Sequence, residues 1–289
     1  MKILFLGIFL ACLNAFTGST FDTITKYSSI NNYKWYHYYA IGGTVAILIL
    51  VFFLLLQKNI KNHILLKKKE YYFLPLIRGL HFIFVLITVF YSLKYIPINI
   101  FTILLMTTPF FLVIFAKLIL KEKLNLISWI AIVVGFCGVL IVLKPSTSNV
   151  NIYIFLILFV AVSNALSFTL VSKYSHIAST YGFTFYGYTP LTVVSYIFFL
   201  NDPIIPSVKE FFLFSCAGVI VMISMWAFNA AYHVAGKYSS IISPFFFTQI
   251  IWGSLYGIIF FSEEISSMTI IGILVIVVSG TIAIYNRNK

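Results

Sequence analysis

Residues 20–30 read TFDTITKYSSI, and 147 positions later residues 167–177 read SFTLVSKYSHI. Aligned without a gap, the two stretches share five identical residues, including a Lys-Tyr-Ser triplet. Each stretch lies at the end of a long apolar run. The repetition indicates an internal duplication, with one copy in residues 1–145 and the other in residues 151–289.

The composition identifies the class of protein. Of 289 residues, 61% are hydrophobic and only 9% are charged, whereas soluble domains carry about 25% charged residues. A helix crosses a bilayer with about 20 apolar residues. The apolar runs here are continuous, which favours helices over the alternating pattern of a barrel. We therefore expect an all-α polytopic membrane protein with ten transmembrane helices, near residues 3–25, 35–57, 71–93, 97–119, 125–143, 151–172, 182–200, 211–232, 239–261 and 266–285.

The positive charges are distributed unevenly along this ten-span chain. Basic residues accumulate in cytoplasmic loops of membrane proteins. With a cytoplasmic N-terminus, 13 basic residues fall inside and five fall outside, namely Lys26, Lys34, Lys94, Lys144 and Lys209. We predict an inner-membrane protein with both termini in the cytoplasm. Residues 1–18 also have the pattern of a signal peptide, but the repeat favours a retained first span.

Each half contains an odd number of expected spans, so the two copies should cross the bilayer in opposite directions. Lys26 is then outside and the matching Lys173 inside. A second correspondence joins Glu122 to Glu263, 141 residues later. Inverted repeats allow two conformations, one open to each side, around a shared site near the midplane. This pattern predicts a transporter that works by alternating access.

Motifs of the first half resemble the EamA repeat of the drug/metabolite transporter superfamily. They are Arg78-Gly79, Tyr91-Ser92-Leu93-Lys94-Tyr95-Ile96-Pro97, Thr108-Pro109-Phe110, Lys121-Glu122-Lys123-Leu124, Trp129, the glycines Gly135 and Gly138, and Lys144-Pro145. The second half keeps Ser243-Pro244, Glu263, Gly272 and Gly280, but has Ile250 and Ile270 where the proline and tryptophan would fall. The resemblance implies two inverted five-helix EamA repeats in a secondary transporter. Members of this superfamily carry amino acids, nucleotide-linked metabolites, vitamins or cofactors.

Ionisable residues inside spans are costly and commonly line a cavity. Arg78 lies about 10 Å into its expected helix, where it either binds a carboxylate or phosphate or extends to the cytoplasmic surface. His81 shares its helical face and is either a lining residue or structural. Asp22 is the deepest acid, and we expect Lys26, one turn later, to pair with it. That pairing disfavours proton coupling through an acid and favours exchange or facilitated movement.

Uncharged polar residues in the apolar runs extend the set of candidates. Substrate-binding candidates are Asn14, Asn164, Ser167, Asn229 and Gln249, which alternatively join helices by hydrogen bonds. Trp226 is an aromatic candidate that could contact a planar or cationic ligand, but it is alternatively a packing or lipid-facing residue. The same two interpretations apply to Trp252 and to the aromatic cluster of Tyr181, Phe183, Phe185, Tyr186 and Tyr188. Pro109 and Pro244 interrupt backbone hydrogen bonding in helical runs and are either gating hinges or fixed kinks. Glu122 and Glu263 are expected to be structural.

Several function classes find no support in the sequence. The net charge of +12 forms no continuous basic stripe, so no nucleic-acid partner is expected. GxSxG, HExxH and Walker motifs are absent, so we predict neither an enzyme, nor a metal site, nor a cofactor. The favoured function is transport of a small polar metabolite, such as an amino acid or S-adenosylmethionine. The alternatives are uptake of a riboflavin-like vitamin or cofactor and a membrane receptor that does not transport. The expected partners are this solute and the lipid bilayer, and the protein is either a monomer or a homodimer.

Overall fold

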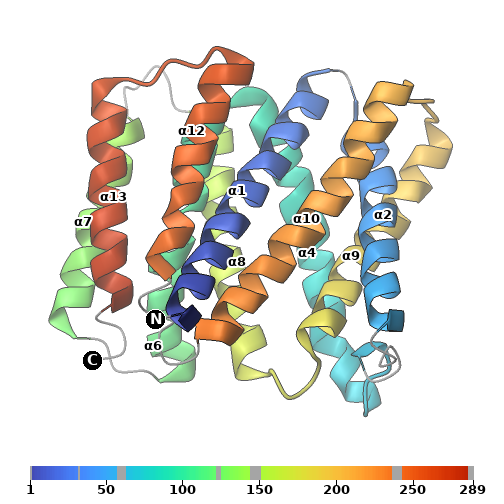
Figure 1. Ribbon diagram of the computed structural model, residues 1–289, viewed down its shortest axis with the longest axis horizontal. Coiled ribbons are helices and arrows are strands. Elements are labelled where there is room, and N and C mark those ends of the chain that lie inside the picture. Colours follow the sequence, from blue (N-terminus) through green and yellow to red (C-terminus); the bar gives the residue numbers. More distant parts are fainter. Residues whose placement is uncertain are drawn as a thin grey trace. The chain divides into compact units, whose positions relative to one another are not determined.

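The computed structural model describes residues 2–31, 33–56, 63–121, 125–143, 151–235 and 243–285. Within these ranges the chain forms helices and no strand, which confirms the all-α prediction. In chain order (Figure 1), the elements are α1 (Lys2–Ile30), α2 (Trp35–Leu56), η1 (Lys69–Tyr72), α4 (Phe73–Tyr95), α5 (Ile98–Leu105), α6 (Thr108–Leu120), α7 (Leu126–Leu143), α8 (Ile152–Lys173), α9 (Thr180–Asn201), α10 (Val208–Ala235), η3 (Ser243–Phe247), α12 (Thr248–Phe261) and α13 (Ser267–Tyr285).

The helices have the length and surface of membrane spans. In the described parts of the chain, eight helices are long and apolar enough to cross a bilayer, and Phe245–Phe261 and Ser267–Ala283 form two shorter apolar helices. Large apolar side chains such as Phe5, Phe52 and Phe73 are exposed. In water these side chains would be unfavourable, whereas hydrocarbon solvates them. The protein is therefore a multi-pass membrane protein.

The chain folds into two compact units, which are described separately. The first unit comprises Met1–Thr23, Tyr95–Lys173 and Ser224–Lys289, and the second comprises Ile24–Lys94 and Tyr174–Ile223. Each unit takes segments from both sequence halves. Helices α1 and α10 contribute to both units, because the division falls within each of them.

In the first unit, α7 packs along α13 (Figure 1) and α5 along α12. Small residues permit these close approaches. A Cβ atom on Gly272 of α13 would lie 2.8 Å from the carbonyl oxygen of Gly138 on α7. A Cβ atom on Gly253 of α12 would lie 2.5 Å from the hydroxyl of Thr102 on α5. Membrane helices that lack a hydrophobic driving force associate through such small-residue contacts.

The fourth expected span is interrupted, which the apolar pattern did not predict. Helix α5 ends at Leu105 and α6 begins at Thr108. The Thr107 hydroxyl donates to the Leu104 carbonyl at 2.7 Å and the Thr108 hydroxyl to the Leu105 carbonyl at 2.6 Å. These bonds satisfy carbonyl groups at the break without water. Pro109 thus stands in the first turn of α6, where its missing N–H costs little, and not inside a continuous helix.

Pro244 has a related position in the second half. It lies in the 3-10 helix η3, directly before α12. The hydroxyl of Thr248, the first residue of α12, donates to the Phe245 carbonyl at 2.6 Å. Both prolines therefore lie at a junction between two helical segments. Their role as gating hinges stays a prediction.

Two left-handed residues end two helices of the first unit. Among non-glycine residues that the structure describes, positive φ angles occur at Lys121 (59°) and Ser262 (52°). These residues are 141 positions apart and cap α6 and α12. Each donates its N–H to a carbonyl five residues earlier, Ala116 for the first and Gly257 for the second. The two helices therefore end with the same local geometry.

Glu263, which follows the second of these caps, holds the start of α5. Its carboxylate accepts hydrogen bonds from the backbone N–H of Ile98 at 2.8 Å and of Asn99 at 3.3 Å. A carboxylate at a helix N-terminus satisfies free N–H groups and complements the helix dipole. These contacts agree with the structural role expected for Glu263. Glu122 lies outside the described residues.

In the second unit, α9 packs against α2 and α4. The expected span at residues 182–200 contains Pro190, which is inside α9 and which we did not single out from the sequence. A proline cannot donate to the carbonyl four residues earlier, here that of Tyr186. Gly79 of α4 approaches this point, because a Cβ atom there would lie 2.4 Å from the Tyr186 oxygen. A glycine therefore fits where α9, at the turn that contains Pro190, meets α4.

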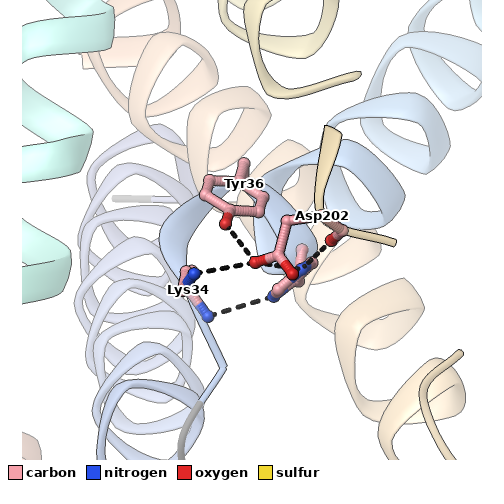
Figure 2. Close-up of polar contacts among 4 residues, drawn as sticks. Lys34, Tyr36 and Asp202 are labelled. Atoms are coloured by element: carbon pink, nitrogen blue, oxygen red, sulfur yellow. Dashed lines mark hydrogen bonds and ion pairs between the residues drawn. The ribbon is translucent and has the colours of Figure 1, made fainter. Parts of the chain in front are cut away.

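A polar cluster joins the start of α2 to the end of α9. Figure 2 shows Lys34 and Tyr36 directed at the carboxylate of Asp202, with donor–acceptor distances of 2.7 and 2.5 Å. His37 accepts from the Lys34 backbone N–H at 3.2 Å, so its other ring nitrogen donates to the Asp202 carbonyl at 2.8 Å. The hydrogen bond from Lys34 lowers the pKa of Asp202 and raises that of Lys34. The cluster fixes one end of the α2–α9 pair.

Candidate functional site

Asn14 and Gln249, two of the predicted binding residues, join helices within the first unit. The Asn14 side-chain amide donates to the carbonyl and the hydroxyl oxygen of Ser224 on α10, at 2.8 and 2.9 Å. Gln249 of α12 donates from Nε2 to Oδ2 of Asp22 on α1, at 3.1 Å. Ser19 donates to the backbone carbonyl of Gln249 at 2.9 Å. The amides thus have at least the helix-joining role that we had considered as an alternative.

Asp22 has a different partner from the one expected. We predicted Lys26, but the hydrogen bond to the Asp22 carboxylate comes from Gln249, which is 227 positions away in the sequence. Asp22 is 6% exposed and Gln249 is 9% exposed. A Cβ atom on Gly18 would lie 3.3 Å from Gln249 Nε2, so the glycine gives the amide room against α1. Sequence reasoning missed this pair because neither residue lies near the other in the chain.

Aromatic side chains lie beside this buried pair on α1 and α12. Phe16 contacts Trp252 edge-to-face, with ring centroids 5.0 Å apart. The hydroxyls of Thr20 and Tyr256 are 3.0 Å apart and form a hydrogen bond. Trp252, which could wall a ligand or serve only in packing, lies three residues and so about one helical turn from Gln249 on α12.

The observed contacts do not join the other candidates of the first unit to Asp22 and Gln249. Asn229 donates to the Met225 carbonyl of its own helix at 2.8 Å, and Trp226 is 48% exposed. Asn164 and Ser167 are half-buried on α8. Their role in binding stays a prediction.

Arg78 and His81 lie on α4 in the second unit, where polar groups are buried without partners. In the described ranges, five buried side-chain polar atoms have no hydrogen-bond partner, and four of them belong to α4 and α9: His81 Nε2, Ser92 Oγ, Tyr188 Oη and Thr189 Oγ1. Buried polar atoms are nearly always hydrogen-bonded in folded proteins. A concentration of exceptions on two neighbouring helices therefore points to groups that bind something else.

Aromatic rings lie beside part of this set of residues on α4 and α9. The Arg78 guanidinium carbon lies 5.6 Å from the centre of the Phe183 ring, and the Phe82 and Tyr188 rings are 5.0 Å apart. Phe183 and Tyr188 are buried, and Arg78 is half-buried. A cation, hydroxyl groups and ring faces on α4 and α9 can together bind an anionic group and an aromatic ring. The sequence had indicated Arg78 and His81, but Tyr188 and Thr189 were missed as hydrogen-bonding residues.

No group of three or more His, Cys, Asp or Glu side chains that could hold a metal ion occurs in the parts of the chain that the structure describes.

Comparison with known proteins gives a consistent picture. Residues 5–144 match the model of the EamA-like transporter family. The chain is 28% identical to the pseudopaline exporter CntI of Pseudomonas aeruginosa, over 71% of this chain and 72% of that protein. It is 26% identical to the S-adenosylmethionine uptake transporter of Rickettsia prowazekii, over 75% and 73% of the two chains. It is 32% identical to the riboflavin transporter of Vibrio cholerae, over 49% and 47%.

One solved crystal structure has the same fold, with a TM-score of 0.66 over 98% of this chain and 96% of the other, at 14% sequence identity. These matches, together with the apolar helices, confirm the resemblance derived from the motifs and identify a membrane transporter rather than an enzyme. Residues 5–144 therefore carry an EamA-like transporter domain, and the chain is similar to transporters of the drug/metabolite transporter superfamily.

Proposed function

We propose that the protein is a secondary transporter that moves a small polar metabolite across the inner membrane by alternating access. The substrate carries an anionic group together with an amino acid or nucleoside-like part. Its site includes α4 and α9 of the second unit. The observation that carries this proposal is the set of buried, unpartnered polar atoms of His81, Tyr188 and Thr189, on the parts of α4 and α9 that lie near Arg78. A solute can supply the hydrogen bonds that the protein itself leaves unmade.

The ten-helix, inverted-repeat architecture is part of the proposal, with repeats at residues 1–145 and 151–289 and both termini cytoplasmic. The left-handed caps at Lys121 and Ser262 support it, because their separation of 141 residues equals that of Glu122 and Glu263. Helices α7 and α13 begin at Leu126 and Ser267, with the same separation. A duplicated unit is expected to repeat both a helix cap and the start of the next helix at the same separation in the sequence.

S-adenosylmethionine fits the chemistry of α4 and α9 better than riboflavin does. It has a carboxylate for Arg78 and an adenine ring for the Phe183 and Tyr188 faces. Riboflavin offers a ring system but no carboxylate. The relatives named for these solutes make both of them test compounds.

Counterflow in proteoliposomes tests the proposal. Labelled amino acids, S-adenosylmethionine, nucleosides and riboflavin are supplied outside vesicles preloaded with the unlabelled compound. Transient uptake of one compound supports the proposal, whereas stoichiometric binding without uptake favours a receptor. Replacement of Arg78 by Ala should weaken transport of an anionic compound by at least about tenfold, the equivalent of about 1.4 kcal/mol for a charge-assisted hydrogen bond. Lys67→Ala, at an exposed lysine of the second unit, is the matched control.

A further inference from the structure

We propose that Asp22 and Gln249 form a proton-binding site in the first unit, and that its protonation drives uphill movement of the solute. This inference rests on the transporter function proposed above. It is carried by the geometry of the pair: a buried carboxylate whose observed hydrogen bond comes from a neutral amide. An exchanger or a passive carrier, which the sequence had favoured, has no need of such a group.

Asp22 lies within α1, and Gln249 lies in the first turn of α12, directly after the 3-10 helix η3. Asp22 precedes the end of α1 at Ile30 by eight residues, which is about 12 Å along the helix axis. Gln249 precedes the end of α12 at Phe261 by 12 residues, which is about 18 Å. Both residues belong to apolar helices that form membrane spans or the shorter apolar set. Intramembrane acids are costly and commonly serve as proton relays.

The surroundings allow both protonation states. Gln249 Nε2 donates to Asp22 Oδ2, which leaves Oδ1 to take a proton while that hydrogen bond persists. An amide donor stabilises the carboxylate only modestly, whereas a fixed lysine or arginine partner would keep it ionised. Burial favours the neutral acid over the carboxylate. The hydrogen bond from Gln249 favours the carboxylate and burial favours the neutral acid. Because these effects oppose each other, Asp22 can gain and lose a proton during a transport cycle.

Few ionisable groups face this site from the elements packed against it. Helix α1 itself carries Lys26 and Tyr27 about one turn later, and Lys26 is buried. Helix α12 carries Tyr256, whose hydroxyl contacts Thr20, and η3 carries no ionisable residue. On α10, Ala231 packs with Leu10 and Ala11 of α1 and is not ionisable. Lys26 is thus the one cation on these elements close to Asp22 in sequence.

The first experiment needs no substrate. Infrared difference spectra of the purified protein in lipid are recorded between about pH 5 and about pH 9, a range above the ordinary titration of exposed acids. We expect a carboxylic acid band that appears on acidification, is absent from Asp22→Asn, and persists in Glu264→Gln, which removes an exposed carboxylate. Gln249→Ala should move the pH midpoint of the band. A spectrum that is identical in wild type and Asp22→Asn overturns the proposal.

The second experiment separates coupling from transport. Proteoliposomes are supplied with a test compound that showed counterflow and are given a gradient of one pH unit. Such a gradient can drive about tenfold accumulation of the compound per proton. We expect Asp22→Asn to lose accumulation but retain counterflow, Asp22→Glu to restore accumulation, and Glu264→Gln to behave as wild type. Accumulation by Asp22→Asn at the wild-type level overturns the coupling role. If the wild type itself shows no counterflow with any compound, the proposed function fails, while the infrared spectra still decide whether Asp22 binds a proton.

Discussion

Replacement of Gly79 by Ala tests the contact between α4 and α9 that positions Arg78 and His81. The structure puts a Cβ atom at this position 2.4 Å from the Tyr186 carbonyl oxygen and 2.9 Å from Cγ of Pro190. Neither neighbour is the end of a flexible side chain. One is backbone and the other is the ring of a proline inside α9. The added methyl group must therefore separate the two helices.

The magnitude follows from two opposing effects. Overpacking of a close contact costs about 1–3 kcal/mol, and a backbone contact this short places the cost near the upper end. Alanine improves helix propensity over glycine by about 1 kcal/mol. The expected net loss is about 2 kcal/mol, or about 4–8 °C in the unfolding midpoint at ~2–4 °C per kcal/mol.

Gly187 on the facing helix provides the matched control. A Cβ atom there meets nothing within 4 Å, so Gly187→Ala should be neutral or slightly stabilising. Both variants are unfolded thermally in the same detergent and followed by intrinsic fluorescence. Equal midpoints for Gly79→Ala and Gly187→Ala would refute the helix-contact reasoning. A lower midpoint for Gly79→Ala with unchanged counterflow would instead separate the helix contact from the substrate site.

Three further outcomes follow from the contacts. Glu263→Gln removes the charge that caps α5 and should cost about 1 kcal/mol of stability, measured as a lower unfolding midpoint than that of Glu264→Gln. Because its partners lower the pKa of Asp202 below 3.8, the stability that its carboxylate contributes is complete above pH 3.8 and is lost as the pH falls through the lower value of the folded protein. The unfolding midpoint of wild type should accordingly fall more steeply than that of Asp202→Asn in acid, and parallel curves would contradict this assignment. Gly272→Val should destabilise the protein by about 1–3 kcal/mol, because α7 and α13 cannot keep their present distance, and an unchanged midpoint would show that these helices separate freely.

Much of the local structure could be predicted from the sequence. Apolar runs long enough to cross a bilayer predicted where helices would form, since backbone groups in hydrocarbon must be satisfied within each segment. The observed helices α2 (Trp35–Leu56), α7 (Leu126–Leu143) and α9 (Thr180–Asn201) lie within two residues of the expected limits. Pro109 predicted a disturbance of this span, but the complete break at Met106–Thr107 could not be predicted, because hydropathy does not distinguish a continuous helix from two pieces joined by threonine hydrogen bonds.

The sequence by itself determined that the chain is a helical membrane protein, and it predicted that its halves are related and that Arg78 is a candidate for binding. Those properties depend on composition and on the order of neighbouring residues. Only the tertiary structure decided that Asp22 meets Gln249 and that Gly79 meets Tyr186, because residues far apart in the chain become partners only through the packing of helices. The free energy of a buried polar group depends on the group that it contacts. The sequence alone could therefore not decide whether Asp22 forms an ion pair with Lys26 or a hydrogen bond with a neutral amide.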